Sequence, residues 1–198
     1  EFFEERVHRI RRQLPDDHDI AEAVSLLKAA KAPLIIAGGG VQYSGATDEL
    51  ATLAHKHGIP VVETIAGRAN MLFEHPLNCG PIGVTGSNSA NALAEKADVI
   101  LAVGTRLQDF TTGSWTAFSK EEKFISINAA RFDAMKHRSI AVVGDALATV
   151  KELDAELGDW KAPAGHLPRA KELFAEWNAL LDSHQTPTNA LIPTYAQV

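Results

Sequence analysis

The chain has 198 residues, a formal net charge of −6 at pH 7 and one cysteine. This length fits one large domain, and the 45% of hydrophobic residues is ordinary for a packed core. The negative charge argues against a nucleic-acid partner, and no apolar run approaches the roughly 20 residues of a membrane span. A single cysteine excludes an internal disulfide and fits a reducing cytoplasm, which is the location we predict.

The opening residues 1–15 carry apolar side chains at helical spacing among several arginines. This pattern predicts a linker helix that packs on a neighbouring domain, and a basic phosphate-binding arm is the alternative. Pro15 interrupts the pattern, and the acidic residues at 16–19 suit the start of the next helix, where backbone N–H groups are unpaired.

Five short apolar runs, with a short strand expected near residues 77–80 in a loop-like stretch, alternate with helical patterns between residue 33 and residue 158. The clearest runs are continuous rather than alternating, which is typical of strands covered on both faces. Crossover helices between successive strands produce a parallel sheet. The sequence therefore predicts an α/β fold, a doubly wound sheet of six parallel strands with helices on both faces. The predicted strands are residues 33–37, 59–62, 77–80, 98–103, 124–128 and 140–143.

We divide the chain into three parts. Residues 1–15 are the linker helix, residues 16–158 the doubly wound domain, and residues 159–198 a second linker with a helix over about 168–183. The apolar face of that last helix must pack on this sheet or on another domain. Both ends of the chain read like the interior of a longer protein, so we expect further domains on either side.

Ligands of open parallel sheets bind at the carboxyl ends of the strands, and several of these ends carry suitable residues. Glycines follow the first strand, a Thr-Arg pair follows the fourth, and an Asn and an Asp end the fifth and sixth. Backbone N–H groups beside glycines and an arginine can bind phosphate, whereas Asn and Asp can bind ribose or adenine. The candidate nucleotide site consists of Gly38, Gly39, Gly40, Thr105, Arg106, Asn128 and Asp145.

Each of these features also has a purely structural interpretation. The dinucleotide motif G-x-G-x-x-G is incomplete because Tyr43 replaces its third glycine, and a tight turn explains residues 38–40 equally well. Arg106 could pair with Asp109 or contact a partner domain instead of a ligand. The amide and the carboxylate at the last two strand ends could cap helices.

Two other segments leave the same choice open. Glu63, after the second strand, could bind a ribose or remain a solvated loop acid. The glycine-rich residues 80–87 could hold a phosphate or connect the sheet edge. The sequence contains no metal-binding or nucleophile motif, and Cys79 has no activating neighbour, so we expect its thiol to be inert.

Three segments resemble the central domain of thiamine-diphosphate enzymes, a family that includes acetolactate synthase and pyruvate decarboxylase. They are APLIIAGGG at residues 32–40, HGIPVVET at 57–64 and ADVILAVGTR at 97–106. The resemblance covers about residues 18–158 and implies a Rossmann-like fold. It also implies domains outside this chain, the first with a Glu that activates thiamine diphosphate and the last with a Gly-Asp-Gly site for Mg²⁺ and diphosphate.

Shorter segments resemble the hydrolases of this family that open the ring of trihydroxycyclohexane-1,2-dione in myo-inositol degradation. They are GGVQYSGA at residues 39–46, ETIAGR at 63–68, GVTGS at 83–87 and DFTTGS at 109–114. The resemblance implies a homo-oligomeric parent enzyme whose thiamine diphosphate and Mg²⁺ bind outside this chain. It assigns a non-catalytic role to this domain.

In some members of the family the central domain binds ADP or FAD through the loops after its first and fourth strands. Those loops here carry residues 38–40, Thr105 and Arg106. Hydrolysis of a carbon–carbon bond has no redox step, so we expect the nucleotide site to be vestigial and no cofactor to bind this domain. The alternative is a module that binds ADP, FAD or NAD in an acetolactate synthase-like protein.

Overall fold

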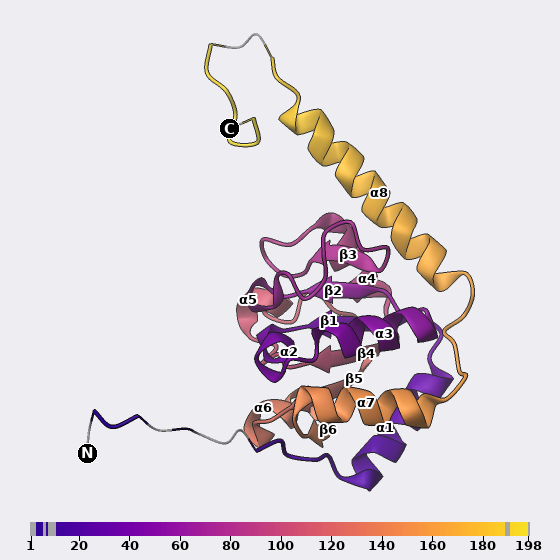
Figure 1. Cartoon of the computed structure of the whole chain (residues 1–198). Coiled ribbons are helices and arrows are strands. Elements are labelled where there is room, and N and C mark those ends of the chain that lie inside the picture. Colours follow the sequence, from indigo (N-terminus) through magenta and orange to yellow (C-terminus); the bar gives the residue numbers. More distant parts are fainter. Residues whose placement is uncertain (1–2, 6, 8–10, 189–190, 198) are drawn as a thin grey trace.

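A computed structural model describes residues 3–5, 7, 11–188 and 191–197. Its six parallel strands form one sheet in the order β3-β2-β1-β4-β5-β6, which confirms the predicted doubly wound fold. The winding reverses between β1 and β4, which are neighbours in the sheet (Figure 1). The strands are β1 (Pro33–Ala37), β2 (Val61–Glu63), β3 (Asn78–Pro81), β4 (Val99–Val103), β5 (Lys123–Asn128) and β6 (Ile140–Val143).

Helices cover both faces of this sheet (Figure 1). The first face packs against α1 (Asp17–Ala29), α3 (Thr47–His57) and α7 (Ala146–Leu157). The second face packs against α4 (Asn88–Lys96) and the first turns of α8 (His166–Gln185). Each face therefore has a hydrophobic core of its own.

Alternation along the strands separates the two cores. Ile35 and Leu101 belong to the core under α1, α3 and α7, whereas their chain neighbours Leu34 and Ile100 belong to the core under α4 and α8. Side chains of consecutive strand residues point to opposite faces, so a fully apolar run fills both cores at once.

Short helical segments lie at the carboxyl ends of the strands. They are α2 (Gly39–Ser44) after β1, η1 (Ile65–Gly67) after β2, α5 (Asp109–Thr112) after β4 and α6 (Arg131–Ala134) after β5. Figure 1 shows α2, α5 and α6 on the same side of the sheet's strands. Residues of these four segments line the candidate site, whereas η2 (Lys136–Arg138), which leads into β6, does not.

The segment before α1 differs from the prediction. No helix is found in residues 3–5, 7 and 11–15, and the rest of the predicted linker helix lies outside the described residues. Pro15 disfavours a helical conformation at the residue before it. The Gln13 carbonyl instead accepts the Asp145 N–H at 2.8 Å, which attaches this segment to the end of β6.

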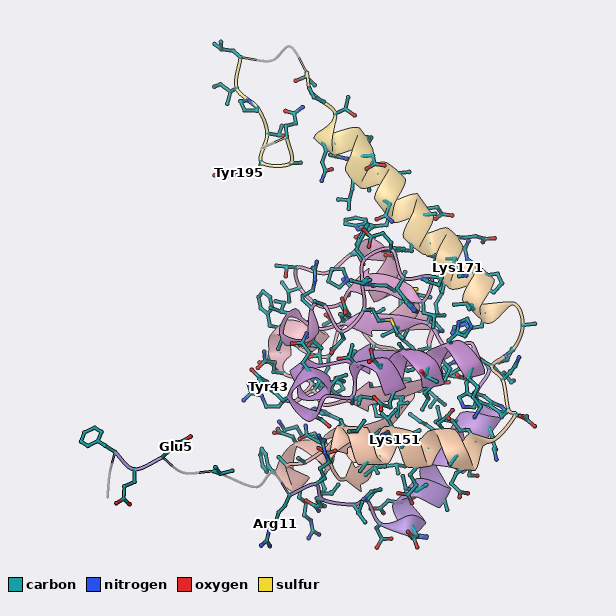
Figure 2. All side chains as sticks on the ribbon, viewed as in Figure 1. Glu5, Arg11, Tyr43, Lys151, Lys171 and Tyr195 are labelled. Atoms are coloured by element: carbon teal, nitrogen blue, oxygen red, sulfur yellow. The ribbon has the colours of Figure 1, made fainter. Side chains whose placement is uncertain are left out.

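The last helix is longer than predicted and leaves the domain. Ala170 in its first turns is fully buried, whereas Leu180 near its end is 43% exposed. Figure 2 shows the part of α8 beyond Lys171 extending away from the sheet. No helix in the described part of the chain is long and apolar enough to cross a membrane.

The loops after β1 and β4 meet through glycine backbone. Gly38 N–H donates to the Val103 carbonyl at 2.8 Å, and Gly40 N–H donates to the Gly104 carbonyl at 2.9 Å. A Cβ added to Gly38 would lie 2.3 Å from the Gly104 oxygen, and one added to Gly40 would lie 2.7 Å from the Gly104 Cα. Gly104 itself has a φ of +60°. Packing therefore excludes side chains at these glycines.

This contact can be tested by adding one methyl group. Gly38→Ala should lower the free energy of unfolding by about 1–3 kcal/mol, because the new Cβ overlaps backbone that cannot move aside. Gly165→Ala is the matched control, since nothing lies within 4 Å of a Cβ there. Urea unfolding measures both, and equal effects of the two substitutions would contradict the packing argument.

Candidate functional site

A cleft of about 490 Å³ opens at the carboxyl ends of β1, β4, β5 and β6. It lies where the winding of the sheet reverses, which is the usual ligand position in such sheets. Six of the seven predicted residues line it, namely Gly39, Gly40, Thr105, Arg106, Asn128 and Asp145. The seventh, Gly38, packs against Gly104. The structure thus brings the predicted residues together, while the absence of a bound nucleotide cofactor stays a prediction.

Thr105 and Asn128 use their polar atoms within the protein. Thr105 is buried, and its Oγ1 accepts the Leu107 N–H at 3.2 Å. The Asn128 Nδ2 donates to the Thr105 carbonyl at 3.1 Å, and the Asn128 Oδ1 accepts the Ala130 N–H at 2.9 Å. Asn128 therefore joins the loops after β4 and β5.

Asp145 is held by three different elements. Its Oδ1 caps α7 by accepting the Ala148 N–H at 3.2 Å, and its Oδ2 accepts the Ser44 hydroxyl at 3.0 Å. The Arg12 guanidinium donates to both carboxylate oxygens, at 2.8 and 3.0 Å. Burial alone would raise the pKa of Asp145, but the hydrogen bonds from Arg12, Ala148 and Ser44 outweigh it and lower that pKa.

Arg12 is the cleft-edge residue that sequence reasoning missed. Its guanidinium also donates to the Ser44 carbonyl at 2.6 Å, so it joins the end of α2 to the start of α7. The arginine-rich opening was the available signal, but spacing along the chain does not reveal a partner 133 residues away.

Arg106 places a positive charge at the exposed rim of the cleft. Its guanidinium donates to the Gln108 Oε1 at 3.1 Å. The structure therefore pairs it with Gln108, whereas the sequence suggested Asp109. Arg106 is the predicted residue best placed to meet an anionic ligand.

Glu63 matches neither of its two sequence interpretations. It is 3% exposed, and its Oε1 accepts the Met71 N–H at 2.8 Å. Burial raises the pKa of this carboxyl, although the loop N–H groups and Arg68 oppose that rise. Glu63 is thus an internal anchor for the loop after β2.

The second glycine-rich segment closes on itself. Gly83 N–H donates to the Asn91 Oδ1 and the Gly83 carbonyl accepts the Asn91 Nδ2, both at 3.0 Å. The Ser87 hydroxyl oxygen accepts the Ala90 N–H at 3.1 Å and caps α4. These bonds favour the connecting role over a phosphate cradle.

Comparison with known proteins identifies the class. Residues 20–153 match the family model described as thiamine pyrophosphate enzyme, central domain. This span covers the sheet, the cleft and most of α7, and the sheet has the doubly wound topology expected for that domain. The chain belongs to the thiamine pyrophosphate enzyme family and corresponds to its central domain.

Within the family, several similar curated proteins are named 3D-(3,5/4)-trihydroxycyclohexane-1,2-dione hydrolase. The relative from Geobacillus thermodenitrificans is 43% identical over 181 residues, which is 91% of this chain. Those from Listeria monocytogenes and Bacillus subtilis are 42% and 41% identical, each over 179 residues or 90% of this chain. The chain spans 28% of the length of each of these relatives.

The described residues do not fit a thiamine diphosphate and Mg²⁺ site. Within residues 3–5, 7, 11–188 and 191–197 there is no group of three His, Cys, Asp or Glu side chains that could hold a metal ion. The sequence at residues 144–146 is Gly-Asp-Ala, and its Asp145 already binds Arg12 and Ser44.

The charge on Asp145 can be tested by Asp145→Asn, which keeps an oxygen for the α7 cap. Since the folded chain lowers the pKa of Asp145, its stabilising effect is present above its ordinary value of 3.8 and is lost as the pH falls through the lower folded value. We expect the variant to lose about 1 kcal/mol of unfolding free energy at pH 7 and a smaller amount near pH 3.

Urea unfolding at both pH values measures this difference. Asp109→Asn is the control at the same strand ends, because Asp109 is exposed. It should change stability by no more than about 0.5 kcal/mol. A deficit of Asp145→Asn that does not depend on pH would contradict the ionic contribution.

Proposed function

We propose that this chain is the central, non-catalytic part of a thiamine-diphosphate-dependent hydrolase. The parent enzyme would open the ring of a trihydroxycyclohexane-1,2-dione by adding water across a carbon–carbon bond, a step of myo-inositol degradation. The observation that carries the proposal is the identity of 41–43% to hydrolases of that name, sustained over 90–91% of this chain.

The cofactors would bind in parts of the parent beyond this chain. Thiamine diphosphate is the cofactor of the family, and we propose Mg²⁺ as the ion that accompanies its diphosphate. We also propose a homo-oligomeric parent in the cytoplasm. The buried thiol of Cys79 suits a reducing compartment, since burial raises its pKa to about 12 and keeps it protonated.

The role of this domain would be to position its neighbours in the chain. The segment before α1 is attached at the cleft edge through Arg12 and Asp145. The start of α8 is attached at the opposite end of the sheet, where the His166 ring contacts the Pro33 carbonyl at 2.7 Å. Polar contacts therefore fix both connections to the sheet, as a rigid spacer requires.

A nucleotide-binding module is the second candidate, favoured by the cleft and its exposed Arg106. The polar groups around the cleft weigh against it. The Gly40 N–H donates to Gly104, and Asn128 and Asp145 bind protein atoms. A nucleotide would have to break these contacts, so we propose that the cleft holds no nucleotide cofactor.

Activity of the longer protein tests the main proposal. The protein with its flanking regions, supplied with thiamine diphosphate and Mg²⁺, should convert the dione into a ring-opened product heavier by one water, as mass spectrometry would detect. The 198-residue chain should neither bind thiamine diphosphate in calorimetry nor hydrolyse the dione.

Two outcomes would contradict this assignment. The first is formation of acetolactate from pyruvate without hydrolysis of the dione, which would favour the acetolactate synthase-like alternative. The second is tight stoichiometric binding of thiamine diphosphate by this chain alone, which would place the cofactor site within it.

A further inference from the structure

His57 is a fully buried histidine at the end of α3, outside the lining of the cleft and not used in the proposed function. It lies where α3, α7 and the connector meet, the connector being residues 158–165 between α7 and α8. A histidine without access to water must satisfy its ring nitrogens within the protein.

Both ring nitrogens of His57 face oxygen atoms that carry no hydrogen. Nδ1 lies 2.6 Å from the Trp160 carbonyl on the connector. Nε2 lies 2.9 Å from the Asp154 Oδ1 on α7. Carbonyls and carboxylates only accept hydrogen bonds, whereas a neutral imidazole has one N–H to donate. A neutral ring would therefore leave two lone pairs facing each other at one of these short distances.

We propose that His57 is a buried imidazolium whose second proton latches the connector, and hence the start of α8, to the domain. The doubly protonated ring donates to both oxygens at once. The Asp154 carboxylate balances its charge. One proton thus joins three elements that are separated along the chain.

The charges around His57 suit this assignment. The Lys56 Nζ also approaches the Asp154 Oδ1, at 3.0 Å, so one carboxylate serves two cations. Burial would raise the pKa of Asp154, but its hydrogen bonds to Lys56 and His57 lower it, so it remains ionised. The other charged side chains of this region lie further along the same helices and on their neighbours. Glu49 on α3 pairs with Lys151 on α7, and Lys28 on α1 lies near Glu156 on α7. The connector carries the exposed Asp159 and Lys161.

The latch acts on the backbone of the connector. Besides the ring contact with Trp160, the His57 carbonyl accepts the Ala162 N–H at 2.8 Å. The side chains of Trp160 and Ala162 pack partly buried against the core under α1, α3 and α7. His166, at the start of α8, follows four residues later. Loss of the ring proton would remove one of the attachments that fix where α8 begins.

The latch needs both ring protons. A neutral ring has one N–H to donate, so it would leave either the Trp160 carbonyl or the Asp154 carboxylate without its hydrogen bond from His57. The effect of losing one bond is local, because both hydrophobic cores remain in place.

Nitrogen NMR of the histidine rings in the unmodified chain tests the proposal without mutation. At pH 7 both ring nitrogens of His57 should show the chemical shifts of N–H groups, as in an imidazolium. A single protonated nitrogen, as in a neutral tautomer, would overturn the proposal.

Hydrogen exchange tests the effect on the connector. His57→Gln should lower the protection factors of the Trp160 and Ala162 amides by about tenfold at pH 6, the loss expected for one charged hydrogen bond. His55→Gln, at an exposed position on the same helix, is the control and should behave like the unmodified chain. Equal protection in the His57 variant and the unmodified chain at pH 6 would overturn the latch.

Discussion

The contact between the loops after β1 and β4 is the constraint on which the rest of the structure depends. These loops belong to neighbouring strands at the point where the winding of the sheet reverses. Gly38 and Gly40 approach Gly104 so closely that neither loop has room for a Cβ. That approach sets the floor of the cleft and directs α2 and the loop after β4 to its two sides. Glycines in this position commonly indicate a phosphate-binding loop. Here the backbone of Gly104 occupies the space next to Gly38 and Gly40.

The cleft follows the same pattern, because its polar groups mostly bind one another. Asn128 joins two loops, and Asp145 joins α2, α7 and the segment before α1. Such bonds make the strand ends rigid but leave few free groups for a ligand. Such rigidity suits the proposed role of a domain that holds its neighbours in place. The chain spans only 28% of the length of its longer relatives.

The sequence predicted those features that local pattern controls. Continuous apolar runs located five of the six strands, and Asp145 was correctly considered as a helix cap. Features that depend on distant partners were missed. Arg12 finds its carboxylate 133 residues later, and the ring of His57 meets Trp160 103 residues later. In the sequence, Glu63 stands at the end of an apolar run, where a solvated acid is expected. Only the fold of the loop after β2 buries its side chain.

Most polar groups of the strand-end cleft bind protein atoms, and we predict that the cleft binds no nucleotide cofactor. Calorimetric titration of ADP and FAD into the chain tests it most directly, with Arg106→Ala as the matched variant. We predict no saturable heat up to millimolar nucleotide for either protein. Stoichiometric binding of either nucleotide, lost in Arg106→Ala, would contradict the account.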